Sequence, residues 1–212
     1  MKRGHWQILL AAALFLLALG LTLYPVVSNW YIGRHQSRIQ TEYREVLEQT
    51  DSAEIESIRE SAVAYNKTIT PGAAEEAYSQ ASIRLAAEDY VNQLNVSGSG
   101  IMGYVEIPKI GADLPIYHGT GADSLDRGTG HLLGSSLPVG GESTHTIITG
   151  HSGMASQKMF TDLEQLREGD IFYLHVLDET LAYEVRTIHT VLPHDTTYLG
   201  IEPGEDLCTL VT

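Results

Sequence analysis

Two short segments carry side chains whose types could do chemistry together. Residues 149–153 read Thr-Gly-His-Ser-Gly and set His151 near two glycines at the end of an apolar strand pattern. Residues 207–212 read Leu-Cys-Thr-Leu-Val-Thr and hold Cys208, the one cysteine in the chain. A cysteine thiolate and an imidazole acid–base group are a recurrent pair in acyl transfer. These two segments therefore form the first candidate site.

Ser152 and the other histidines are weaker candidates. Ser152 follows His151 directly, and neighbouring side chains point apart on a strand, so the two do not form a nucleophile and its base. His118, His131 and His145 could join His151 around zinc, because imidazole is a common zinc ligand. Their spacing does not fit a metal motif, so we expect no metal and no other cofactor.

An apolar N-terminal stretch indicates a membrane anchor. Residues 8–27 are uncharged and apolar, and about 20 such residues span a bilayer as a helix. Lys2 and Arg3 precede the stretch, which favours a cytoplasmic N-terminus and an exported C-terminal side. A cleaved signal peptide is the alternative, but its apolar core is usually shorter and no clear cleavage site follows here. We therefore predict an uncleaved, single-pass anchor.

Charge and cysteine content argue against a nucleic-acid-binding protein and against a disulfide-stabilised domain. The net charge of −14 argues against a nucleic-acid partner, which would require a basic footprint. Acidic side chains recur between residues 42 and 60, as expected for a solvated helix face. A single cysteine allows no intrachain disulfide, so an exported domain must depend on its apolar core.

The rest of the chain divides into a helical part and a β part. Helices are predicted over 34–59 and 73–94, followed by a Gly/Ser-rich linker at 95–100. Short strands are then predicted at 102–108, 114–117, 145–149, 171–176, 181–191 and 207–212, with one helix at 156–166. Many short strands between glycine turns predict a closed or nearly closed β-barrel.

An ordered set of motifs runs through this β part. In chain order they are IMGYVEIPKI (101–110), LPIYHGT (114–120), GTGHLLGSSLPVGG (128–141), TGH (149–151), FTDL (160–163), GD (169–170) and LAYEV (181–185). No single one is specific, but together they resemble class C sortases, the pilin-polymerising branch. The resemblance implies a mainly β fold, a sortase-like closed barrel of about eight strands. The expected domains are 1–7 cytoplasmic, 8–27 transmembrane, 28–99 helical and lid-like, and 100–212 the barrel with its last strand missing.

The same resemblance assigns the chemistry. It implies that His151 is the catalytic histidine, and that the nucleophile is the cysteine that ends the family motif T-L-V-T-C. Thr212 occupies the threonine before that cysteine and is expected to shape the substrate site, so the nucleophile would follow Thr212. Neither it nor the arginine expected beyond it, which would stabilise an oxyanion, is in the chain. Cys208 lies five residues earlier, on the opposite strand face and about 16 Å away, so we expect it to be a small buried apolar side chain.

Three explanations of this chain end stay open. The sequence is a fragment of a longer gene, or a natural truncation that yields an inactive relative, or the product of a gene in which a UGA selenocysteine codon follows Thr212. An in-frame UGA after the Thr212 codon, followed by codons for a last strand and an arginine, would support selenocysteine or a recent nonsense change, and selenium detection in the full-length protein would separate those two. The family lid usually carries Asp-Pro before the barrel; no Asp-Pro occurs here, so a functional lid is in doubt.

The expected activity is that of a cysteine transpeptidase. Class C sortases cleave LPXTG-like sorting signals between Thr and Gly and join the acyl group to a lysine amine of a pilin. The expected partners are surface or pilin proteins that bear this signal, and the expected location is the membrane of a Gram-positive cell with the barrel outside. The alternatives are a housekeeping-type sortase, which anchors proteins to the cell wall, and a catalytically inactive homologue.

Overall fold

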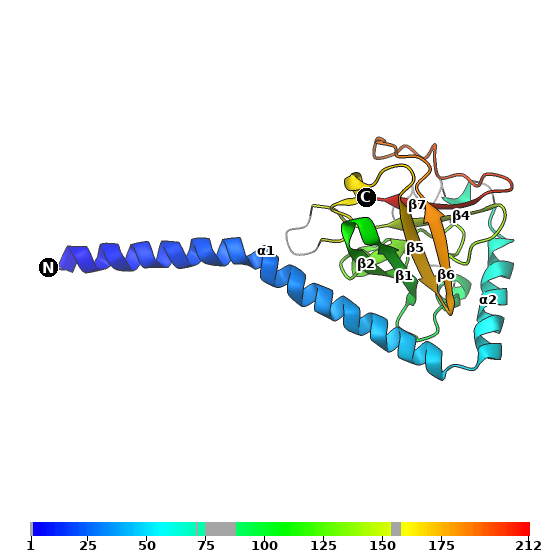
Figure 1. Ribbon diagram of the computed structural model, residues 1–212, viewed down its shortest axis with the longest axis horizontal. Helices are drawn as coiled ribbons and strands as arrows, with labels where there is room; N and C mark the ends of the chain where they lie inside the picture. Colours follow the sequence, from blue (N-terminus) through cyan, green and yellow to red (C-terminus); the bar gives the residue numbers. More distant parts are fainter. Residues whose placement is uncertain (1, 71, 75–87, 154–157) are drawn as a thin grey trace.

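A long helix projects from a small β-barrel in the computed structural model, which describes residues 2–70, 72–74, 88–153 and 158–212 (Figure 1). The described strands form one seven-stranded sheet in the order β6-β5-β1-β2-β3-β4-β7. In chain order they are β1 (Ile101–Ile107), β2 (Ala112–His118), β3 (Thr129–His131), β4 (Thr144–Thr149), β5 (Ile171–Val176), β6 (Glu179–Glu184) and β7 (Asp206–Val211). The described helices are α1 (Lys2–Gln49), α2 (Ser52–Asn66), α4 (Glu88–Asn92) and α5 (Ala122–Leu125), with 3-10 turns η1 (Pro108–Ile110) and η2 (Leu163–Gln165).

The two edge strands, β6 and β7, approach each other and nearly close the barrel. The Tyr183 hydroxyl on β6 donates a hydrogen bond of 2.9 Å to Asp206 Oδ1 on β7. Leu181 and Tyr183 of β6 join the same apolar core as Cys208 and Leu210 of β7. The predicted mainly β, nearly closed barrel is therefore confirmed.

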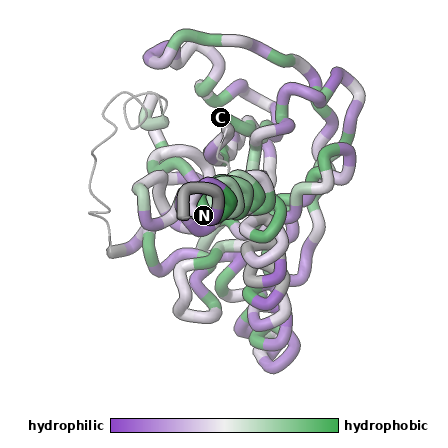
Figure 2. The backbone as a smooth tube through the Cα atoms, turned by 90° about the vertical axis from the view of Figure 1, so that its left-hand side faces the viewer, coloured by the Kyte–Doolittle hydropathy of each residue, from purple (hydrophilic) through white to green (hydrophobic). Residues whose placement is uncertain are grey.

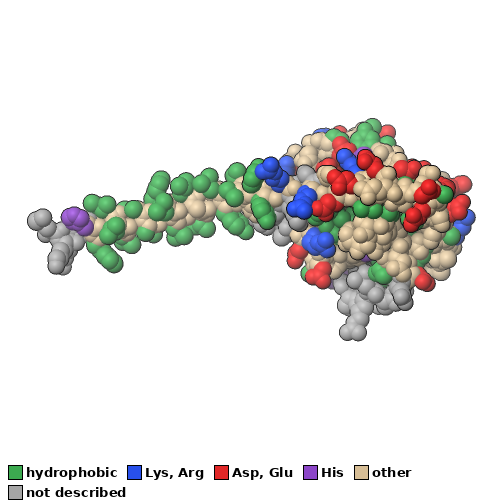
Figure 3. All heavy atoms as spheres, turned by 90° about the horizontal axis from the view of Figure 1, so that it is seen from below, with side chains coloured by type: hydrophobic (Ala, Val, Ile, Leu, Met, Phe, Trp, Pro, Cys, Tyr) green, Lys and Arg blue, Asp and Glu red, His purple; other side chains and the backbone are tan. Residues whose placement is uncertain are grey.

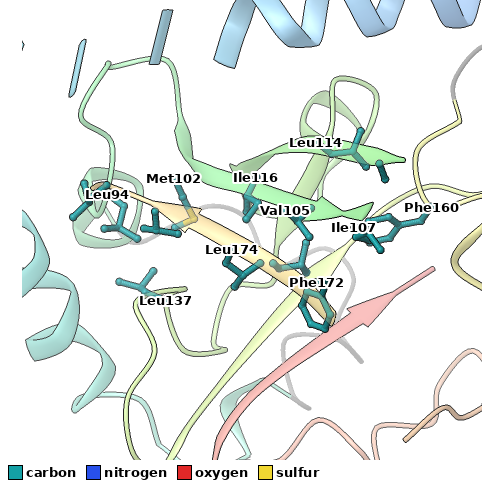
Figure 4. Packing of buried hydrophobic residues seen from close by; sticks show 14 of the residues in the cluster. Leu94, Met102, Val105, Ile107, Leu114, Ile116, Leu137, Phe160, Phe172 and Leu174 are labelled. Atoms are coloured by element: carbon teal, nitrogen blue, oxygen red, sulfur yellow. The ribbon is translucent and has the colours of Figure 1, made fainter. Parts of the chain in front are cut away.

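Alternating side chains fill the barrel with apolar groups (Figure 4). The core includes Met102, Val105, Ile107, Leu114, Ile116, Phe172 and Leu174 from β1, β2 and β5. A register irregularity in β1 between Ile101 and Gly103 shifts the alternation. Because of it, Met102 and Val105 both belong to the core, while Ile101 and Tyr104 pack in a separate cluster with α1. One strand thus serves the barrel interior and the helix docking face.

Helix α1 joins an apolar N-terminal half to the barrel. Its segment His5–Ser28 is, among the described residues, the one helix long and apolar enough to cross a membrane, and it is unburied (Figure 2 views the chain nearly along it). Pro25 interrupts the backbone hydrogen bonds of α1, which changes direction part-way along (Figure 1). Further on, the buried Tyr43 hydroxyl donates to the Met102 carbonyl and accepts from the Leu177 amide, both at 3.2 Å. The last turns of α1 are therefore part of the packed domain.

The helical prediction for 34–59 is confirmed with one break. Helix α1 ends at Gln49, and Asp51 caps α2 by accepting a 2.8 Å hydrogen bond from the Ala53 amide. Arg59 then ion-pairs with Asp178 and Glu179 at the β5–β6 turn, which ties α2 to the barrel. Most of the predicted helix 73–94 lies outside the described residues; α4 falls at its end.

Two other local predictions were wrong. The helix predicted over 156–166 is absent from its described part, where turns lead into η2. Met159 has φ 34°, a left-handed conformation that a right-handed helix cannot contain. The strand predicted over 181–191 stops at Glu184, because Glu184 pairs with Ile171, the first residue of β5, and no partner strand continues beyond it. The short β3 was not predicted as a strand.

Candidate active site

The two segments singled out in the sequence meet in the structure. Strands β4 and β7 pair in parallel, with Thr149 opposite Val211, and the Gly150 amide donates a 2.9 Å hydrogen bond to the Val211 carbonyl. His151 follows directly, and Thr212 follows Val211 at the exposed end of β7. The histidine and the last residues of the chain therefore lie side by side, although sixty residues separate them in sequence.

Phe160 fixes the backbone that carries His151. Its amide donates a 3.0 Å hydrogen bond to the His151 carbonyl. Its ring packs against Gly150 so closely that a Cβ there would lie 2.6 Å from Phe160 Cδ2. Only glycine therefore fits at position 150 without moving the ring. The His151 side chain, 41% exposed, can meet a molecule from solvent.

Asp126 is an acidic group near His151 that the sequence did not suggest. Its Oδ1 lies 3.9 Å from His151 Nε2. It follows α5, in the loop before β3, and β3 pairs with β4 so that Gly130 lies opposite Thr149. Twenty-five residues separate Asp126 and His151, and no local pattern in the sequence marks the pair. Only the pairing of β3 with β4 brings them together.

The Cys208 side chain faces the opposite side of β7 from Val211. It pairs with Thr146 and, with Leu210, packs against the barrel core, whereas Val211 packs in a second cluster with Ile147. Burial, reinforced by the Asp206 carboxylate, raises the pKa of the Cys208 thiol well above its ordinary range. The thiol is thus neutral at pH 7, and the barrel wall separates it from His151.

We predict that Cys208 is chemically inert in the folded protein. At pH 8, iodoacetamide should alkylate Cys208 in the folded chain about 100-fold more slowly than in the same chain unfolded in urea. The raised pKa of the thiol in the folded state removes the thiolate on which the reaction depends. Intact-mass spectrometry over time measures both rates. As a control, Ser152→Cys in a Cys208→Ala chain puts a thiol at the exposed neighbour of His151 and should react quickly. Equal rates for folded and unfolded Cys208 would contradict this assignment.

His131 and His145 are structural histidines. His131 is fully buried, with Nδ1 2.9 Å from the Tyr90 hydroxyl and Nε2 2.9 Å from the Ser136 carbonyl. Burial lowers the pKa of His131 to about 4. His145 is buried and contacts the Gly200 carbonyl and the Thr209 hydroxyl, both at 2.7 Å. In the described part of the chain no three His, Cys, Asp or Glu side chains lie close enough to hold a metal ion.

The fold and this site together characterise one class of β-barrel protein. In this class a half-exposed histidine lies where two parallel strands, here β4 and β7, end together. Residues 105–212 match the Sortase domain family, and the chain belongs to that family.

Solved structures and curated relatives agree with this membership. The chain is similar to sortase C of Streptococcus pneumoniae at 43% identity, with a TM-score of 0.73 over 82% of this chain and 86% of that one. It is similar to sortase C1 of Streptococcus agalactiae at 38% identity, with a TM-score of 0.71 over 82% and 88% of the two chains. It is 32% identical over 110 residues to Sortase D of Bacillus subtilis, covering 52% of each protein, so it spans about half the length of that relative. The resemblance to class C sortases is confirmed.

Proposed function

We propose that this protein is a membrane-anchored, class C-like sortase. In this proposal it cleaves LPXTG-type sorting signals between Thr and Gly and joins the acyl group to a lysine amine of a pilin. Family membership and the likeness to sortase C structures at 38–43% identity support the transpeptidase role. The apolar segment of α1 supports a single-pass anchor. Lys2 and Arg3 before it favour a cytoplasmic N-terminus, and the proposal therefore places the barrel outside the cell.

The register of β4 and β7 is the observation that carries the proposal. Thr149 lies opposite Val211, so the same register continued by two residues would pair His151 with the position after Thr212. Residues opposite each other in a parallel pair lie about 4.8 Å apart and face the same side of the sheet. A cysteine at that position would have the His151 imidazole as its neighbour. Val211 and Thr149 precede this pair on the same face.

The proposed reaction needs two proton transfers through His151. The thiolate attacks the threonine carbonyl carbon, and the C–N bond to glycine breaks as the imidazolium gives its proton to the leaving amine. A thioester and neutral His151 result. A lysine Nζ then attacks the thioester and gives a proton to His151, the C–S bond breaks, and an isopeptide bond replaces it. Thr212, immediately before the nucleophile, would shape the site through its backbone, because its side chain alternates to the other face of β7.

Competition between acceptor amines tests the proposal. The chain is extended by one cysteine after Thr212, placed in detergent micelles, and given an LPXTG peptide with equal amounts of a pilin-derived lysine peptide and oligoglycine. We expect the lysine isopeptide product to form about tenfold faster than the oligoglycine product, and no product from a scrambled peptide. Liquid chromatography with mass spectrometry counts each product.

A housekeeping-type sortase is the second candidate. The chain is 30% identical over 124 residues to Sortase A of Staphylococcus aureus, which keeps this reading open. A preference for oligoglycine in the competition would favour it over the pilin proposal. Failure of the extended chain to form any acyl adduct would favour an inactive homologue.

A further inference from the structure

The charges on α1 are distributed asymmetrically. The first 41 residues contain no Asp or Glu; their charged residues are Lys2, Arg3, Arg34 and Arg38. All 27 acidic residues of the chain follow, beginning with Glu42. A purely basic zone therefore lies between the apolar segment and an acidic barrel. In Figure 3, Lys and Arg side chains gather where the apolar helix reaches the barrel.

Exposed aromatic side chains mark both ends of the apolar segment. Trp6 is 71% exposed at one end, and Trp30 and Tyr31 are 62% and 67% exposed at the other. The two tryptophans are 24 positions apart in the sequence, which corresponds to about 36 Å of helix. A bilayer has a hydrocarbon core of about 30 Å. Both indoles therefore fall at the interfaces, where Trp and Tyr are enriched.

Arg34 and Arg38 follow Trp30 and Tyr31 on α1, on the barrel side of the apolar segment. The Arg34 guanidinium carbon lies 5.3 Å from the centroid of the Trp30 ring. Arg38, 77% exposed, has Nε 2.9 Å from Glu42 Oε1. An exposed pair of this kind is weak, so Arg38 can exchange the carboxylate for a phosphate oxygen. We call Trp30, Tyr31, Arg34 and Arg38 the basic collar.

The barrel holds the collar in place. Immediately after Arg38, the Ile39 carbonyl accepts a 3.4 Å hydrogen bond from the Tyr104 hydroxyl, and Gln40 Nε2 donates to the Asp113 carbonyl at 3.3 Å. Tyr43 follows, buried against β1. The collar thus sits at a fixed helical distance from the docked turns, about 14 Å between Arg34 and Tyr43. Acidic groups of the barrel that lie farther than the Debye length of about 8 Å from the lipid surface repel it only weakly.

We propose that the basic collar binds the phosphate headgroups of anionic lipids at the barrel side of the membrane. The proposal rests on the membrane anchor of the proposed function and goes beyond it. It predicts a lipid preference: anionic lipid should accumulate around Trp30, and Arg34 and Arg38 should cause that accumulation.

Two tryptophans make the test specific, because each can be isolated. The full chain carrying Trp6→Phe leaves Trp30 as the one tryptophan, and Trp30→Phe leaves Trp6. Each is reconstituted in bilayers of phosphatidylglycerol and brominated phosphatidylcholine, and fluorescence quenching gives the relative binding constant of the two lipids. We expect phosphatidylglycerol to be favoured about fivefold at Trp30, the effect of about one arginine at an anionic surface. Arg34→Gln with Arg38→Gln should reduce the ratio to about one.

Two controls distinguish an effect of the collar arginines on lipid preference from an effect of the net charge of the chain. Lys67→Gln with Arg186→Gln removes two exposed cations from α2 and the barrel, and should leave the ratio at Trp30 unchanged. The collar substitutions should also leave the ratio at Trp6 unchanged. No preference at Trp30, or a preference that survives loss of both arginines, overturns the collar while the anchor stands. Absence of quenching by any brominated lipid overturns the anchor as well.

Discussion

A chain extended by one cysteine after Thr212 is expected to form a thioester with an LPXTG peptide about 100-fold to 10,000-fold faster than the same chain with His151→Gln. This range is the usual contribution of a positioned acid–base group. The β4–β7 register would place the added thiol opposite His151, and without the imidazole the leaving amine departs unprotonated. Acid quenching followed by intact-mass spectrometry measures the acylation rate.

Three matched chains define the result. His175→Gln removes an imidazole on the outer face of the barrel, where Nε2 lies 2.8 Å from Glu106, and should keep the parent rate. Cys208→Ala should also keep it, since Cys208 faces the core. The 212-residue chain itself should give no adduct. An adduct on Cys208, or a rate indifferent to His151, would refute the proposed site.

Acid is expected to destabilise the barrel through His131. Its folded pKa of about 4 lies below the unfolded value of about 6.5, so the neutral form is favoured on folding. The stability tied to that difference is fully present above pH 6.5 and is lost as pH falls toward 4. The unfolding free energy should decline by up to about 1.4 kcal/mol per pH unit in this window, on the order of 3 kcal/mol in total. Urea titrations at half-unit pH steps measure it.

Two variants test whether His131 causes the pH dependence of the unfolding free energy. His131→Asn removes the titrating group and should flatten the curve between pH 6.5 and 4, even if its stability at pH 7 is lower. His175→Gln, on the exposed face of β5, should retain the parent slope. A slope that persists in His131→Asn would assign the acid sensitivity to other groups. Burial gives the physical reason, because an imidazolium at this site is cut off from water, and the hydrogen bond to the Ser136 carbonyl offsets that cost only in part.

Local patterns predicted those parts of the fold that depend on neighbours in sequence. The strand predicted over 171–176 matches β5 in its bounds, and the three- and four-residue spacing predicted the helical segment after the anchor. Prediction failed where distant groups decide. Met159 takes a left-handed conformation beside Phe160, which packs on Gly150, and this interrupts the expected helix. Strand β6 ends at Glu184, opposite Ile171 where its partner β5 begins, and residues 185–191 by themselves do not reveal that end.

The candidate site divides in the same way. The sequence by itself supplied the family motifs, the prediction that His151 is the catalytic histidine, and the expectation that Cys208 faces away from the site. The last of these follows because strand alternation is local. Only the tertiary structure decided that β4 and β7 pair in parallel, that Asp126 lies 3.9 Å from His151, and that α1 docks through Tyr43. Those contacts join residues 25 or more positions apart. Pairing between such distant segments follows from closing the sheet around one apolar core, which no short window of sequence contains.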